Sequence, residues 1–474
     1  MRHIRTFGLV MGWILIFFIS FASAQVEKSQ SYTNQQRQVE ESVRLQLDRD
    51  LPANQKVLLD YGGWLSSYFF IFDDGIKNRT LRRQDLRVWG SMNADDGIHQ
   101  GYARMKLGYS DFNHGDGYDG DEDDFERPRL DRGWYQLDLA KLLRKRASVD
   151  VPFDLAIKIG RDYAMFGTGY ALSMPMDMIQ INGGIGPFKI DGLLGRTIHS
   201  WDNLDTSRPR PGDSWRYFYG VQARYTGLAK HEPFVYYVWQ KDRQHDGNPL
   251  LKLQEWRYNS EYLGAGSTGQ ILQNWRYSGE MVYESGESYA DQTIFHQDEI
   301  SAYGWDLKLE YLAPWKLHPK FSLEYMFASG DADRIFSPSN AVGGNRYGTH
   351  DTGFNGFGYR NTGLAMAPDL SNIHIWRAGA SFFPLENFRK DLLKKLELGT
   401  DWFLYNKNKG NAAISDPLAD QQSGYLGWEM DYFANWRFTS DLAWTIRYGA
   451  FFPGKAYSDE TTRTFFLTGI TWSF

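Results

Sequence analysis

Basic side chains recur at alternate positions of several aromatic-rich segments, where they could bind anions. A guanidinium group donates paired hydrogen bonds to a carboxylate. A water-filled passage lined by such groups would attract an acidic polymer. The residues are Arg216, Arg224, Arg276, Lys308, Arg377, Arg437 and Arg447.

Carboxylates alternate in the same segments and allow a second interpretation of these bases. They are Glu280, Glu310, Glu324, Glu397, Asp401, Glu429 and Asp431. Acids and bases that pair across neighbouring strands would brace a wall rather than hold a ligand. The pattern therefore predicts either a ladder of ion pairs or a path with alternating sites for a hydrated glycan.

A separate acidic cluster runs from Asp116 to Asp124. Clustered carboxylates can bind calcium, but the spacing lacks the central glycine and the closing glutamate of an EF-hand loop. A solvated outer loop is the favoured interpretation, and calcium binding stays open.

Catalytic signatures are missing from the sequence. There is no H-E-x-x-H, G-x-S-x-G or P-loop motif, the histidines are scattered, and the chain has no cysteine. A net charge of −6 gives no general attraction to nucleic acid. We expect no enzyme, no metal site, no cofactor and no nucleic-acid partner.

Strict alternation in these segments indicates β-strands with two chemically different faces. From Trp215, Tyr303 and Leu426 onwards, one face is rich in tryptophan and tyrosine and the other carries the charges. A soluble sandwich would turn the polar face outward. Aromatic residues at the ends of an apolar face are typical of membrane barrels, whose interior is polar. The composition agrees, with 16% aromatic residues at a mean hydropathy of −0.52.

The last ten residues have the pattern of a barrel's closing strand. Phe466, Thr468, Ile470, Trp472 and Phe474 form a mostly apolar set, and the intervening residues form a smaller, mixed set. Roughly seventeen or eighteen strand candidates can be found in all, which predicts a wide barrel with an aqueous lumen. The fold class expected is all-β, an antiparallel up-and-down transmembrane barrel of about 18 strands.

The first residues resemble a secretory leader. Arg2 and Arg5 precede an apolar run from Phe7 to Phe21, and Ala22-Ser23-Ala24 offers a cleavage site. We expect a signal peptide over 1–24, a periplasmic or lumenal segment over 25–54 and the barrel over 55–474. A capping box and four-residue apolar spacing predict a short helix from Thr33 to Asp48, with a disordered extension as the alternative.

Short motifs in order along the chain resemble the alginate export family of outer-membrane proteins. The resemblance implies an eighteen-stranded monomeric barrel that secretes a polyuronate through an arginine-rich constriction. The motifs are Arg132-Gly133-Trp134-Tyr135, Ile159-Gly160-Arg161, Glu324–Asp331, Leu370-Ser371-Asn372-Ile373, Gly427–Asp431 and Phe452–Tyr457.

Residue by residue, the resemblance carries over only in part. Arg132 and Arg447 match constriction arginines, but Tyr163, Ala367 and Thr445 stand where the family has further arginines. A contact between the glycan and Tyr163 could replace part of the lost charge. The family's long periplasmic turn before the penultimate strand is reduced here to Thr439-Ser440-Asp441. Either the Thr33–Asp48 helix or the loop Gly343–Gly363 is therefore expected to fill the pore.

The function expected is export of an acidic, alginate-like polysaccharide through a charged lumen in the bacterial outer membrane. Expected partners are the anionic polymer, outer-membrane lipid and periplasmic export proteins, and the barrel is expected to be a monomer. The alternative is a selective or general porin for uptake of oligosaccharides or small solutes. Arg161 requires a bulge at Gly160 to face inward. The residues expected to contact the polymer are Arg132, Arg161, Arg447, Arg377, Arg437, Tyr163, Glu429 and Asp431.

Overall fold

The computed structural model describes residues 57–73, 75–117, 122–198, 215–243, 258–289, 297–334, 346, 348–388 and 391–474. The expected signal peptide and the Thr33–Asp48 helix lie outside the described residues. No helix in the described ranges is long and apolar enough to cross a membrane.

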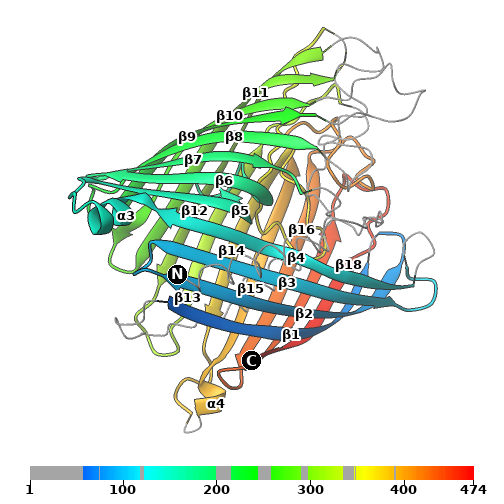
Figure 1. Ribbon diagram of the computed structural model, residues 1–474. Helices are drawn as coiled ribbons and strands as arrows, with labels where there is room; N and C mark the ends of the chain where they lie inside the picture. Colours follow the sequence, from blue (N-terminus) through cyan, green and yellow to red (C-terminus); the bar gives the residue numbers. More distant parts are fainter. Residues whose placement is uncertain are drawn as a thin grey trace.

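Eighteen strands form one closed antiparallel sheet, as the alternating sequence pattern predicts (Figure 1). Each strand pairs with the next along the chain, and β1 pairs with β18 to close the ring. The strands are β1 (Val57–Asp73), β2 (Asn78–Ala94), β3 (His99–Phe112), β4 (Asp123–Asp138), β5 (Phe153–Met165), β6 (Ser173–Ile185), β7 (Phe188–Arg196), β8 (Arg216–Tyr225), β9 (His231–Asp242), β10 (Asn259–Leu272), β11 (Trp275–Tyr289), β12 (Gln297–Leu312), β13 (Lys320–Ala328), β14 (Ile373–Phe382), β15 (Leu396–Lys407), β16 (Tyr425–Arg437), β17 (Leu442–Pro453) and β18 (Arg463–Ser473).

Two short helices lie between strands at the same end of the barrel. Helix α3 (Leu139–Arg146) joins β4 to β5, and α4 (Asp391–Lys394) precedes β15 (Figure 1). Asp138 caps α3 by accepting a hydrogen bond of 2.9 Å from the backbone N–H of Lys141. The short turns Asn93–Gly97 and Thr439–Ser440 share this end, because both join an even-numbered strand to the next odd-numbered one. Short turns mark the periplasmic side of such barrels.

The outer and inner faces follow the predicted alternation. In β18, Ile470 and Trp472 are 48% and 51% exposed, whereas Leu467 and Thr471 face inward and are 0% and 5% exposed. One expectation is wrong: Leu426 is buried inside rather than lipid-facing. The β15–β16 register shifts at this point, and Gly427 takes a φ of +130°, so a bulge turns Leu426 inward.

Candidate functional site

The inward faces of β2 to β5 carry a dense group of charged side chains that we call the basic wall. Cross-strand register places them on one face: Arg87 is opposite Lys106, Arg104 is opposite Arg132, and Gln136 is opposite Lys158. In the ion pairs that link these strands, seven bases share four carboxylates, so the group carries an excess of positive charge. Its members are Arg83, Asp85, Arg87, Arg104, Lys106, Glu126, Arg129, Asp131, Arg132, Lys158 and Asp162.

Burial divides the basic wall into a supporting layer and an accessible layer. The Arg83 side chain is 2% exposed and lies 2.9 Å from Glu126. Arg132, in contrast, is 28% exposed and lies 3.6 Å from Asp162. The β3–β4 register skips Asp131, and this bulge brings Asp131 and Arg132 to the same lumen-facing cluster. Of the arginines predicted from sequence, Arg132 is thus the one that belongs to the basic wall.

Arg161 lies on the outer face of the barrel, contrary to expectation. Pairing of β5 with β4 and β6 continues without a shift through Gly160, although this glycine has a φ of +137°. Arg161 therefore keeps the orientation of Ile159, which is 52% exposed, and bonds to Asp177 at 2.8 and 3.2 Å. This position is incompatible with contact to a polymer inside the lumen.

Tyr163 shares the outward register of Arg161. Its hydroxyl lies 3.0 Å from the carbonyl oxygen of Ser173, and its ring centre lies 5.9 Å from the guanidinium carbon of Arg132. The contact to Arg132 occurs just where β4 and β5 stop pairing, beyond Gly133 and Arg161. Tyr163 therefore packs against Arg132 from the outer face and does not line the lumen as predicted.

A segment of the loop between β13 and β14 crosses the lumen from wall to wall. We call its described part, residues 348–372, the crossing segment. On one side, Phe354 packs against Tyr262 of β10 with ring centres 6.3 Å apart. On the other side, Leu364 packs into an apolar cluster with Phe70 of β1 and Phe465 of β18. Strands β1 and β10 stand opposite each other in an eighteen-membered ring, so the segment spans the interior. It includes most of the predicted plug loop Gly343–Gly363, whose first residues lie outside the described ranges.

Two charged groups attach the crossing segment to the wall. Arg360 donates to Asp306 of β12 at 2.6 Å and lies 3.7 Å from Glu280 of β11. Burial alone would lower the pKa of Arg360, but the charges of the surrounding carboxylates, led by Asp306 and Glu280, outweigh it and raise the pKa. Glu429 of β16 accepts backbone hydrogen bonds from Leu364, Ala365 and Met366 at 2.6, 2.7 and 2.9 Å. A single carboxylate that accepts several N–H groups is a strong anchor.

Asp369 should make the attachment of the crossing segment to the barrel wall, which we call its seated form, sensitive to pH. This residue lies outside the strands, and removal of its carboxyl from water by burial raises the pKa of that group to about 7. An unfolded aspartate titrates near pH 3.9, so the seated form loses stability as pH rises from about 4 through about 7. We expect more frequent channel opening at about pH 8 than at about pH 5. Single-channel recordings of D369N should show no such dependence; an unchanged dependence would contradict this assignment.

The remaining predicted residues lie on the inner face of β14, β16 and β17. Arg377 bonds to Asp401 at 2.9 and 3.0 Å and to Glu324 at 2.9 Å, as the wall-bracing interpretation expects.

The other predicted residues of this region have different surroundings. Arg437 donates to the carbonyl of Ser440 in the periplasmic turn. Arg447 lies over the Phe433 ring, at 5.6 Å from its centre. Asp431 is buried beside Glu429 on β16. Arg447 is five strands away from Arg132 around the ring.

Replacing Arg377 should weaken the barrel itself. R377M leaves Glu324 and Asp401 facing each other without their shared base, and breaking a buried pair in this way costs about 3 kcal/mol. Because water in the lumen screens the charges, the loss should fall at or below that figure. Urea unfolding of R377M against R377M/D401N measures it, and the double variant should recover part of the stability. Equal stability of R377M and the parent chain would argue for a ligand-binding role instead.

Sequence reasoning missed Arg360 and most of the basic wall. The run Arg83-Gln84-Asp85-Leu86-Arg87 shows charges at every second position, and this signal could have been found. The sequence around Arg360 does not alternate as a strand does, so it gives no sign of which way the side chain points. Only the folded loop reveals that Arg360 pairs with Asp306 and Glu280. At the acidic loop, Asp119 and Asp121 lie outside the described residues. Across the described ranges, no cluster of acidic or histidine side chains has the arrangement of a metal site.

A closed eighteen-stranded barrel with an aromatic, lipid-facing exterior and a charged lumen defines a channel protein of the bacterial outer membrane. The alginate export family matches residues 180–466, more than half of the chain, and the protein belongs to this family. The match contains the crossing segment and Arg447. The basic wall precedes it.

Solved structures with a similar fold include a porin. OccK5 (OpdH) of Pseudomonas aeruginosa has a TM-score of 0.54 at 10% identity, covering 88% of this chain and 98% of that one. A BenF-like porin from Pseudomonas fluorescens Pf-5 has a TM-score of 0.52 at 11% identity, with coverage of 88% and 98%. OprD of P. aeruginosa has a TM-score of 0.51 at 12% identity, with coverage of 88% and 95%. A comparison with curated protein sequences gives no match. At these identities the likeness concerns the fold.

Proposed function

We propose that this channel exports an anionic, uronic-acid-containing polysaccharide across the outer membrane. The observation that carries the proposal is the basic wall, where positive side chains outnumber carboxylates and Arg132 is accessible from the lumen. Uronate carboxylates would exchange between Arg132 and neighbouring bases as the chain advances. The carboxylates already present keep each contact weak enough for release, as conduction requires.

The crossing segment acts as the gate in this proposal. It occupies the lumen between β1 and β10 and is held by Arg360 and Glu429. A polymer would pass along the basic wall, on the side of the lumen where β2 to β5 lie. Transport is passive, with periplasmic proteins delivering the polymer to a monomeric barrel.

A second candidate function is uptake of small anionic solutes. The observation that favours it is the same crossing segment, because a loop that spans the lumen narrows the route. The fold similarity to a porin is compatible with either direction of transport.

Planar-bilayer recording of the purified protein distinguishes these functions. For export, we expect anion selectivity and block by polymannuronate, with no block by a neutral glucan of equal length. For small-solute uptake, monomeric uronate should reduce the ion current through the channel, and the long polymer should leave that current unchanged. A non-selective current that no uronate blocks would contradict both.

A further inference from the structure

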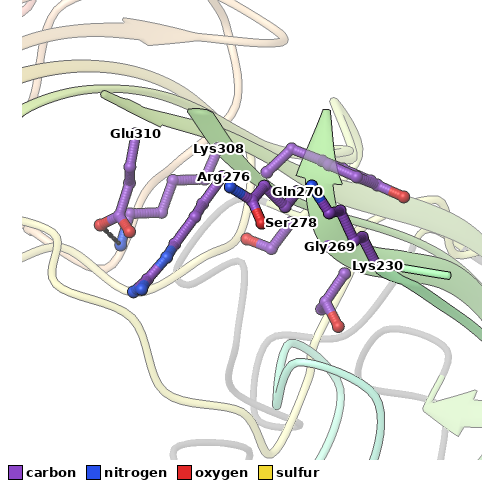
Figure 2. A pocket seen from close by; sticks show the side chains of 9 residues that line it. Lys230, Gly269, Gln270, Arg276, Ser278, Lys308 and Glu310 are labelled. Carbon is purple, nitrogen blue, oxygen red and sulfur yellow. Dashed lines mark ion pairs between the residues drawn. The ribbon is translucent and has the colours of Figure 1, made fainter. Parts of the chain in front are cut away.

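A recess of about 410 Å³ opens in the inner wall at the periplasmic end of β10 to β12 (Figure 2). This volume lies within the range of small-ligand sites, roughly 300–1,000 Å³. Its basic lining comes from Arg276, Lys308 and Lys230, the last of these in the turn between β8 and β9. Figure 2 shows Arg276 and Lys308 extending from adjacent strands, with the ion pair from Lys308 to Glu310 beside them.

The charges of the recess do not balance. Glu310 is the one acidic residue among the described residues that line it, and it is shared by Lys308 and by Lys320 of β13, both at 3.0 Å. Arg276 and Lys230 are exposed, and neither forms an ion pair with any described residue. A site with this excess of positive charge attracts an anion.

Neutral polar groups complete the lining with the chemistry of sugar recognition. Thr268, Gln270 and Ser278 supply hydroxyl and amide groups on the inward faces of β10 and β11. A uronate residue carries a carboxylate for the basic side chains and hydroxyl groups for these polar ones. Arg276 can bind such a carboxylate through two parallel hydrogen bonds.

We propose that this recess is an entry subsite that captures a uronate residue of the polymer at the periplasmic mouth. The inference rests on the proposed export function and adds a place where translocation begins. The recess lies at the end with the short turns, whereas Phe354 of the crossing segment contacts Tyr262 nearer the opposite end of β10. A polymer entering from the periplasm meets the recess before it reaches the crossing segment.

The test uses oriented single channels and a mannuronate oligomer added to one side at a time. With the parent chain, we expect block from both sides. R276Q and K230Q should each weaken block from the periplasmic side about tenfold, as loss of a hydrogen bond to a charged group predicts. Block from the extracellular side should not change. R276K should weaken periplasmic block less than R276Q does, because lysine keeps the positive charge but lacks the paired donors.

The matched control is R146Q, which removes an exposed positive charge at the same end of the barrel but outside the lumen, in α3. R146Q should leave block by the oligomer unchanged. A single-channel conductance equal to that of the parent chain shows that each variant is folded. Oligomer block that is equally strong in R276Q, K230Q and the parent overturns the subsite and leaves export intact. Absence of block in the parent chain itself instead overturns the proposed function.

Discussion

Replacing Glu429 with alanine should open the lumen. The variant removes the acceptor of three backbone hydrogen bonds from the crossing segment and leaves those N–H groups without it. Hydrogen bonds to a charged group contribute about 1.5–3 kcal/mol each, so loss of all three should lower the ratio of seated to released segment by roughly 1,000-fold or more. Single-channel recording should show larger and longer openings than in the parent chain.

Two further variants define what the Glu429 result means. E429Q keeps one acceptor oxygen at the same place, and its behaviour should lie between that of the parent and the alanine variant. E397Q changes another inward carboxylate of the same region, which accepts from Asn435 at 3.4 Å, and should leave conductance unchanged. If the openings of E429A have the same size and duration as those of E397Q, the crossing segment is not the gate.

Replacing Arg132 with glutamine should reduce both anion selectivity and block by polymannuronate. Arg132 is the most exposed arginine of the basic wall, at 28%, and losing its charged hydrogen bonds to a uronate predicts roughly tenfold weaker block. Reversal potentials in a salt gradient give the selectivity, and concentration–block curves give the affinity. The effect should shrink at high ionic strength, because salt screens an accessible charge.

R161Q provides a matched control for R132Q. The two arginines lie on neighbouring strands, but register places Arg161 on the outer face, where it pairs with Asp177. R161Q should therefore leave selectivity and block unchanged. An equal loss in both variants would mean that general surface charge, and not the basic wall, controls polymer contact.

The fold could be predicted from sequence because, in each strand of a membrane barrel, every second residue faces the same environment and has a type that suits it. Lipid requires apolar and aromatic side chains on one face, and water in the lumen permits charges on the other. The alternation in β8, β12 and β18 therefore predicted both the barrel and the orientation of its side chains. The register error at Leu426 arose because a bulge adds one residue without disturbing composition, and only the pairing of β15 with β16 reveals it.

The site was accessible only in part. Sequence alone determined the class of protein, the inner face and the mixture of bases and acids on it, since these depend on local alternation. Tertiary structure decided which charges meet. It placed Arg377 between two acids and turned Arg161 outward. It also brought Arg360 to Asp306 on one side of the lumen and the backbone N–H groups of the crossing segment to Glu429 on another. Such contacts join residues far apart in the chain. The local sequence of a loop without periodicity does not indicate which strands the loop will contact.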